Sequence, residues 1–318
     1  SGKTNFGLAI FDIEYHLSQK WKKPDFLENY IYAGNMHALV KFEYTFKFGS
    51  QIVEYTYSKK EKGVFVNEKL VVDGEKIFNR ENNSFTLATK YFPNDEIITE
   101  NLKNSANNIS VVNFLLMYYP LGADNYLVKM QEFANKMLWF RCVDVKEFIG
   151  IETQDSCNIE EYFIANDLVQ EFSEFLDNIS GQKFDFVPPQ KGDKQLWYKV
   201  GSLEVLFNTT ASTGTRSLEL LFFWLKRMKD AKFVFVDEFD AFYHFDLAFK
   251  LCKYMFEIDS QIFLSSHNTY LMTNDLLRPD CNFLINGNKI KPLCDCTDKD
   301  LRFGHNIEKL FRGKAFQL

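Results

Sequence analysis

The chain begins with residues whose types suit phosphate binding. Ser1-Gly2-Lys3-Thr4 matches the end of the pattern G-x-x-x-x-G-K-[ST], and a helical apolar periodicity comes directly after it. In such an arrangement backbone N–H groups hold phosphate oxygens, Lys3 supplies a positive charge and the Thr4 hydroxyl ligates Mg²⁺. The predicted nucleotide-binding residues are therefore Ser1, Gly2, Lys3, Thr4 and Asn5. A Gly-Lys-Thr triplet also occurs by chance at protein surfaces, so the interpretation depends on partner residues later in the chain.

A pair of carboxylates stands after an apolar segment later in the chain. Phe233–Val236 reads as a buried strand, and Asp237 and Glu238 come directly after it. A buried parallel strand brings such residues to its carboxyl end, where open α/β sheets bind ligands. Asp237 is predicted to hold Mg²⁺, directly or through water, and Glu238 to orient and deprotonate the attacking water. A solvated strand end is the alternative for the two acids taken alone.

Two further segments place polar residues beside predicted elements. Ser212, Gly214 and Thr215 precede an apolar helix, where small and hydroxyl residues form an anion site. Ordinary N-capping explains the same residues, and both interpretations can hold together. His267 comes after the apolar strand Ile262–Leu264, which would allow a hydrogen bond to a γ-phosphate. A structural role is the alternative for this histidine.

The elements that must position these residues begin with a helix from Lys3. Phe6, Ala9, Ile10, Ile13 and Leu17 are spaced to form one apolar face of that helix. An antiparallel meander comes next, predicted from alternating residues at 40–48, 53–57, 64–66 and 70–72, with Asp73-Gly74 as a hairpin turn.

The rest of the chain changes first to helix and then to alternating strands and helices. Helices are predicted at Ser110–Tyr119, Asp124–Phe140 and Ile159–Ile179, the last with Gly181 as its C-cap. Strands are predicted at Trp197–Val200, Leu203–Phe207, Phe233–Val236, Ile262–Leu264 and Phe283–Ile285, and helices at Ser217–Met228, Leu247–Phe256 and Tyr270–Leu277. Such alternation predicts an α/β fold with a mainly parallel sheet flanked by helices. The expected parts are 1–100 and 191–318 as one divided domain, with 101–190 as a helical insertion.

Composition narrows the classes of protein. The 318 residues carry a net charge of −6, which gives no support to broad attraction to nucleic acid, although a local basic patch can still exist. The six cysteines show no spacing typical of zinc, and no apolar run approaches the roughly 20 residues that a membrane-spanning helix needs. These features predict a cytoplasmic protein with no membrane partner. Because the chain begins inside a motif, we also expect a segment before Ser1.

The four segments, in this order, resemble the Walker A, signature, Walker B and H-loop motifs of ABC-type P-loop ATPases. Within that group the sequence is most similar to stand-alone AAA-like ATPases related to the OLD family and to bacterial abortive-infection proteins. His244 stands in the segment after the two acids, without the proline that the family has there, and the ending Gly304–Leu310 is also similar. Asn35 is a weak candidate for the Q-loop residue.

The resemblance implies a mechanism and partners. ATP and Mg²⁺ bound to one copy would meet Ser212, Gly214 and Thr215 of a second copy, in two composite sites of a head-to-tail homodimer or higher oligomer. Glu238 and His267 would be the catalytic residues, and Thr4 and Asp237 the metal ligands. The family further implies a role in anti-phage defence with a separate effector, a nuclease or toxin, and a trigger such as nucleic acid or a phage component.

Three alternatives stay open. An SMC-like DNA-repair or DNA-clamp ATPase needs long coiled-coil arms, and the segment 101–190 shows no sustained heptads. A transporter's nucleotide-binding subunit would be shorter and would not have Thr213 and Thr215 in its signature. A nucleotide-gated scaffold with little hydrolysis is disfavoured by the presence of Glu238.

Overall fold

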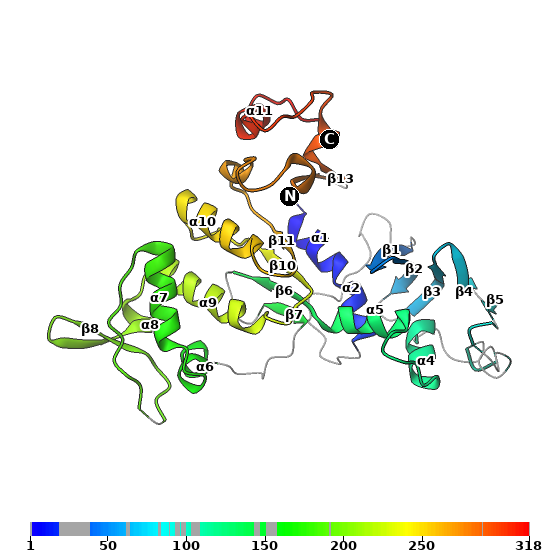
Figure 1. Cartoon of the computed structure of the whole chain (residues 1–318), viewed down its shortest axis with the longest axis horizontal. Helices are drawn as coiled ribbons and strands as arrows, with labels where there is room; N and C mark the ends of the chain where they lie inside the picture. The colour runs from blue at the N-terminus through cyan, green and yellow to red at the C-terminus, as the bar shows by residue number, and fades with distance from the viewer. Residues whose placement is uncertain are drawn as a thin grey trace. The chain divides into compact units, whose positions relative to one another are not determined.

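The computed structural model describes residues 2–18, 39–61, 64–81, 84–88, 90–92, 96, 100–102, 109–142, 147–150, 158–190, 192–287 and 289–317 (Figure 1). The chain divides into two compact units: Phe11–Asn135 forms one, and Ser1–Ile10 with Lys136–Leu318 forms the other. The predicted boundaries at 100 and 190 do not coincide with this division, because the chain re-enters the second unit at Lys136. We call the first the meander unit and the second the site unit.

The meander unit contains the antiparallel sheet that the alternation predicted. Its strands are in chain order: β1 (Val40–Phe48), β2 (Gln51–Glu61), β3 (Val64–Val72), β4 (Glu75–Glu81) and β5 (Ser84–Leu87). β3 is one continuous strand where two were expected. Asp73 and Gly74 join β3 to β4 with φ of 50° and 82°, and positive φ at both central residues is typical of a tight hairpin turn.

Three helices accompany this sheet. They are α2 (Asp12–Leu17), α4 (Val111–Tyr118) and α5 (Tyr126–Asn135), which contact one another, and α5 also contacts β1. The Ser110 side chain caps α4 by accepting a hydrogen bond from the Asn113 N–H at 3.1 Å, so this predicted helix is confirmed with its cap. The single helix expected over residues 3–17 is instead two helices interrupted at Phe11, and Ala9 is exposed rather than part of an apolar face.

Charged side chains are buried between α2 and the sheet. Tyr57 and Lys59 both donate hydrogen bonds to one Asp12 carboxylate oxygen, at 2.6 and 2.7 Å. Asp12 and Lys59 are each 1 % exposed, so the ion pair lies in the interior of the unit. Nearby, Glu68 accepts hydrogen bonds from Arg80 and from the Val111 N–H, at 2.7 and 2.8 Å. Buried charges of this kind need such partners, because an unpaired charge would have lost its hydration without compensation.

The site unit is built on a four-stranded sheet of order β11-β10-β6-β7. β6 (Met137–Arg141), β10 (Phe233–Asp237) and β11 (Gln261–Leu264) run parallel, and the short β7 (Phe148–Gly150) runs antiparallel to β6. Its helices are α1 (Lys3–Ile10), α6 (Ile159–Ala165), α7 (Val169–Ser180), α8 (Phe207–Thr210), α9 (Thr213–Arg227), α10 (Phe245–Phe256) and α11 (Ile307–Arg312). Two hairpins complete it: β8 (Trp197–Val200) with β9 (Leu203–Leu206), and β12 (Phe283–Asn286) with β13 (Lys289–Pro292).

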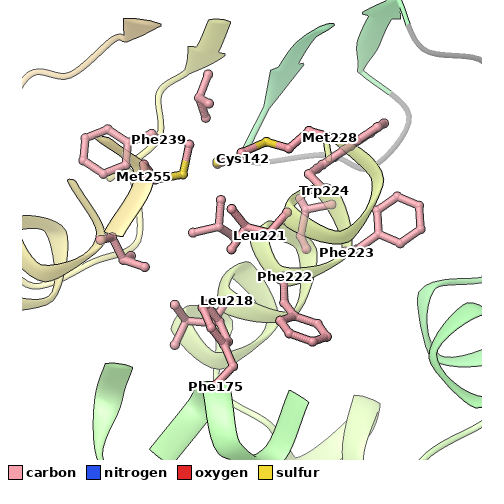
Figure 2. Packing of buried hydrophobic residues seen from close by; sticks show 14 of the residues in the cluster. Cys142, Phe175, Leu218, Leu221, Phe222, Phe223, Trp224, Met228, Phe239 and Met255 are labelled. Carbon is pink, nitrogen blue, oxygen red and sulfur yellow. The ribbon is translucent and has the colours of Figure 1, made fainter. Parts of the chain in front are cut away.

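The core of this unit surrounds α9. Figure 2 shows Leu221 and Trp224 of this helix in one cluster with Phe175 of α7 and Met255 of α10. Every residue from Ser217 to Leu225 is buried, as expected for a helix segment enclosed on all sides. None of the helices in the described ranges has the length and apolar character needed to cross a bilayer.

Two of the long predicted helices do not have the expected bounds. The helix expected over Asp124–Phe140 ends at Asn135, and Met137–Arg141 is a central strand. The helix expected over Ile159–Ile179 is interrupted between Ala165 and Val169, where Asp167 has a φ of 55°. The Gly181 C-cap is confirmed, with a φ of 72°.

Two predictions near the C-terminus also fail. The expected helix Tyr270–Leu277 is reduced to one 3-10 turn, Thr269–Leu271. Thr273 accepts a hydrogen bond from the Asp275 N–H, and Asn274 donates to the Phe303 carbonyl at 2.8 Å. The first is a local bond of the kind that competes with helical hydrogen bonding, whereas the second joins the segment to a distant part of the chain. The strand predicted at Phe283–Ile285 is present as β12, but it pairs with β13 and not with the parallel sheet. Short 3-10 turns at Pro279–Cys281 and Leu293–Cys296 flank this hairpin.

His16 should make the protein sensitive to acid. Burial, together with the positive charge of Lys59, lowers the pKa of His16 from 6.5 to about 3. In the unfolded chain His16 therefore takes up a proton below about pH 6.5, whereas in the folded chain it does so only near pH 3. Stability contributed by neutral His16 is present above pH 6.5 and falls by up to about 1.4 kcal/mol per pH unit below it.

We expect His16→Gln to flatten the loss of stability between pH 6.5 and 4, measured by urea unfolding with circular dichroism. His244→Gln, at an exposed histidine, is the control and should leave the slope unchanged; an equal slope for His16→Gln and the parent would contradict the assignment.

Candidate functional site

The start of α1 and the end of β10 converge. The Thr4 hydroxyl donates a hydrogen bond to Asp237 Oδ2 at 2.7 Å, although the two residues are 233 positions apart. Asp237 is the last residue of β10 and is 0 % exposed, whereas Thr4 is half-buried in the first turn of α1. The structure thus brings together the two residues that the sequence predicts as metal ligands, and their metal-binding role stays a prediction.

The adjoining strand, β11, also contributes a predicted residue. Lys3 Nζ lies 2.9 Å from Nε2 of His267, which comes shortly after the end of β11. An ammonium can only donate, so the histidine tautomer that accepts at Nε2 would complete this hydrogen bond. His267 is exposed, and the pair lies at the same end of the sheet as Asp237. Lys3 and His267 can therefore both reach a phosphate group placed at this end.

Ser265 is a site residue that the sequence reasoning did not single out. Its hydroxyl donates to Asp237 Oδ1, at 2.5 Å, and accepts from the Glu238 N–H at 2.9 Å. Both carboxylate oxygens of Asp237 thus accept a hydroxyl hydrogen bond, one from Ser265 and one from Thr4. The available signal was its position directly after the apolar residues of β11, where a polar side chain reaches the sheet edge.

Glu238 leaves the sheet with an unusual backbone. Its φ is +51°, a left-handed conformation that costs a non-glycine residue about 1–3 kcal/mol when the surroundings impose it. The Ser265 hydroxyl holds the Glu238 N–H, and the Glu238 carbonyl accepts from the Ala241 N–H at 3.2 Å. The side chain is 34 % exposed, so the Glu238 carboxylate, unlike that of Asp237, is open to solvent.

Arg141 is a second residue that the sequence reasoning missed. It ends β6 and stands opposite Asp237 in the parallel register. Its Nε lies 3.4 Å from Glu238 Oε2 and 3.7 Å from Asp237 Oδ2, and its Nη1 donates to Glu147 at 2.9 Å. Partial burial disfavours the charged guanidinium, but the Glu147 hydrogen bond and the three carboxylates outweigh that effect and raise the pKa of Arg141. The residue was missed because the helical periodicity of the sequence extends to Phe140.

The thiol beside these carboxylates is not a nucleophile. Burial, together with the negative charges of Asp237 and Asp240, raises the pKa of Cys142 far above its ordinary value. A thiol that stays protonated is inert toward electrophiles. Its backbone N–H donates to the Asp237 carbonyl at 3.2 Å, which extends the β6–β10 ladder to the end of the strands.

The predicted signature residues form a separate group. Ser212 caps α9, accepting from the Thr215 N–H at 3.1 Å, and the Thr215 hydroxyl donates to Gln182 at 3.0 Å. A Cβ on Gly214 would lie 3.3 Å from the Phe242 carbonyl oxygen. These contacts confirm N-capping, and they join the group to Gln182 and Phe242 rather than to Lys3 or Asp237. An anion-binding role for Ser212, Gly214 and Thr215 stays a prediction.

The remaining predicted residues lie at the start of the chain or outside the described part. Gly2 has a φ of 116°, which favours glycine there, and Asn5 is exposed on the first turn of α1. Ser1 and Asn35 lie outside the described residues.

The oxygen atoms at this position suit Mg²⁺. The Thr4 hydroxyl and the Asp237 carboxylate are hard oxygen ligands that already lie together. In proteins Mg²⁺ is commonly held by one or two carboxylates, with waters and substrate phosphates completing its shell. Within the described ranges no group of three or more His, Cys, Asp or Glu residues gathers as metal ligands. A metal held by Thr4 and Asp237 would take waters and oxygens of a bound phosphate as its remaining ligands.

The comparisons with known proteins bear on part of this unit. A family described as "AAA domain, putative AbiEii toxin, Type IV TA system" matches residues 149–273, less than half of the chain. The matched segment includes α9, β10 and β11 with Asp237, Glu238 and His267, but not α1. It therefore resembles an AAA domain in the part that carries the strand-end acids. None of the curated proteins compared with the chain matches it.

Solved structures give weaker likenesses. One is an SMC head bound to the C-winged helix domain of ScpA, with 15 % identity over 86 % of this chain and 80 % of that chain, and a TM-score of 0.39. Another is the SMC head domain from Thermotoga maritima, with 14 % identity over 86 % of this chain and 78 % of that chain, and a TM-score of 0.35. TM-scores this low do not establish a shared fold.

Gly7 sets how closely α1 approaches the sheet. A Cβ at this position would lie 2.8 Å from the Phe235 ring and 3.0 Å from Trp139 Nε1. Alanine favours a helix over glycine by about 1 kcal/mol, but overpacking a tight core costs about 1–3 kcal/mol. We expect Gly7→Ala to lower the unfolding free energy and to weaken nucleotide binding, because α1 and Thr4 must move. Thermal unfolding and fluorescent-nucleotide titration measure the two effects. Gly122→Ala, where a Cβ meets nothing within 4 Å, is the control; a more stable Gly7→Ala protein would show that the contact is not constraining.

Proposed function

We propose that this protein is an ABC-type ATPase that binds and hydrolyses ATP at the edge of the parallel sheet. The observation that carries the proposal is the 2.7 Å contact between Thr4 and Asp237, with Lys3 and Glu238 adjacent to them in sequence. A phosphate-binding helix start and a strand-end carboxylate pair are what phosphoryl transfer to water requires, because positioning and charge stabilisation do most of the catalysis.

Each side chain then has a defined task. Lys3 and the first N–H groups of α1 neutralise the triphosphate, and His267 donates to or accepts from its terminal group. Glu238 accepts a proton from the attacking water, while Ser265 fixes Asp237 and the backbone of Glu238. Thr4 and Asp237 would hold Mg²⁺, which would supply positive charge against the negative charge of the triphosphate.

We further propose that two copies close over the nucleotide. The N-terminus of α9, with Ser212, Gly214 and Thr215, would face the phosphates of the partner copy in a head-to-tail homodimer. Support comes from the length of α9, 15 residues, and from the exposure of Ser212 at its start. A helix N-terminus favours an anion through its unpaired N–H groups and its dipole. ATP would then stabilise the dimer, and hydrolysis would release it.

The biological setting that we propose is anti-phage defence of the abortive-infection type. The ATPase would sense a trigger or drive a response, and a separate effector such as a nuclease or toxin would act on the cell. This role is supported by the resemblance to abortive-infection and OLD-related ATPases and by the AbiEii toxin named in the matching family.

Glu238→Gln tests the hydrolytic role. The amide keeps the shape of the side chain but cannot take a proton, so we expect turnover to fall by about 10²–10⁴ while ATP binding is retained. Phosphate release and fluorescent-nucleotide titration measure the two properties. Glu204→Gln, at an exposed position of β9, is the matched control and should hydrolyse ATP normally. Parental turnover by Glu238→Gln would remove this residue from the mechanism.

Ser212→Arg tests the composite site. A long cation at the start of α9 should block closure of the dimer, yet leave ATP binding by single copies nearly unchanged. Light scattering with and without ATP, in the Glu238→Gln background, measures dimer formation. Ser212→Asn retains a capping side chain and Thr209→Arg places the same charge nearby at an exposed residue, so both should still dimerise. Nucleotide-dependent dimerisation of Ser212→Arg would refute the arrangement.

A further inference from the structure

Arg141 has contacts that the proposed hydrolysis does not use. Parallel pairing of β6 with β10 brings it opposite Asp237, and its Nε lies 3.4 Å from Glu238 Oε2 and 3.7 Å from Asp237 Oδ2. Glu147 accepts a hydrogen bond from Nη1 at 2.9 Å and holds the guanidinium at the strand end. One permanent cation therefore stands between the carboxylate predicted to hold a metal and the carboxylate predicted to activate water.

The geometry at Nε is that of a counter-ion. Nε is buried and donates no hydrogen bond to any of the described residues, although both carboxylates lie within ion-pair distance. The oxygens of Asp237 already accept hydrogen bonds from Thr4 and Ser265. Charge, rather than directional bonding at Nε, thus keeps this side of the guanidinium in place. A contact held mainly by charge is exchangeable when another cation competes for the same oxygens.

We propose that Arg141 is a positioning residue that acts as a built-in counter-ion for Asp237 and Glu238 and excludes divalent cations until the triphosphate binds. The inference rests on the proposed function, and it adds an order of binding to it. A guanidinium does not lose its proton in proteins, so it competes with a metal at every physiological pH. The triphosphate would bring acceptors for both cations, so that Asp237 would hold the metal and Arg141 would pair with the added negative charge.

Manganese binding without nucleotide tests the inference directly. Mn²⁺ is titrated into the full chain and free Mn²⁺ is measured by electron paramagnetic resonance. Removing a positive charge about 4 Å from the ligand oxygens should tighten Mn²⁺ binding by about tenfold or more. We expect this gain in Arg141→Gln and in Arg141→Met, whereas Arg141→Lys should stay close to the parent. Arg278→Gln removes an arginine from the exposed pair with Asp280 and should change nothing.

The outcomes separate this inference from the proposed function. Unchanged or weaker Mn²⁺ binding in both folded neutral variants would overturn the counter-ion role, even if the parent hydrolyses ATP. If the parent and all variants fail to bind ATP in the presence of Mn²⁺, the proposed function fails instead. The proposal requires that the neutral variants bind Mn²⁺ more tightly than the parent without nucleotide. It also requires that this difference in affinity between variant and parent becomes smaller when ATP is present. A purely structural role for Arg141 would lower metal affinity, so it predicts the opposite sign.

Discussion

The close contact between α1 and the β10 strand is the constraint on which the site depends. Only a residue without a side chain fits at Gly7, where a Cβ would lie 2.8 Å from the Phe235 ring. Glycine weakens a helix by about 1 kcal/mol relative to alanine, but its lack of a side chain permits α1 to approach the sheet closely here. Thr4 lies one turn before Gly7, and Asp237 lies two residues after Phe235. The packing that buries Gly7 is therefore the packing that brings the Thr4 hydroxyl within 2.7 Å of Asp237.

The parallel register then gathers the charged groups. β6, β10 and β11 end at the same edge, so Arg141, Asp237 and Ser265 become neighbours although they are far apart in the chain. Arg141 and Lys3 provide positive charge, and Asp237, Glu238 and Glu147 provide negative charge. No single segment contains the site, because the ends of three strands and the start of one helix each contribute part of it.

The sequence predicted the parts of the site whose signals are local. Lys3, Thr4, Asp237, Glu238 and His267 stand next to apolar segments that read clearly, and the structure brings them to one edge. The sequence could not reveal β6, because Met137–Arg141 continues a helical periodicity and its strand conformation depends on pairing with β10. Arg141 was missed for that reason. Likewise, Tyr270–Leu277 has helical spacing, but the Thr273 hydroxyl accepts from the Asp275 N–H, a local bond that competes with helical hydrogen bonding. The periodicity of apolar residues shows neither long-range strand pairing nor competition between side-chain and helical hydrogen bonds.

Asp237 and Glu238 differ in how tightly their side chains are held, and this difference suits them to the different roles that we propose for them. Asp237 is fully buried, and hydroxyl donors occupy both of its oxygens, so its position is fixed by Thr4 and Ser265. Glu238 has a left-handed backbone, a partly exposed carboxylate and an ion pair with Arg141. A rigid carboxylate suits the proposed role of holding a metal, whereas a partly exposed carboxylate suits the proposed role of orienting a water molecule. Ser265 joins the two residues, because its hydroxyl accepts from the N–H of Glu238, whose backbone is left-handed, and donates to the Asp237 carboxylate at once.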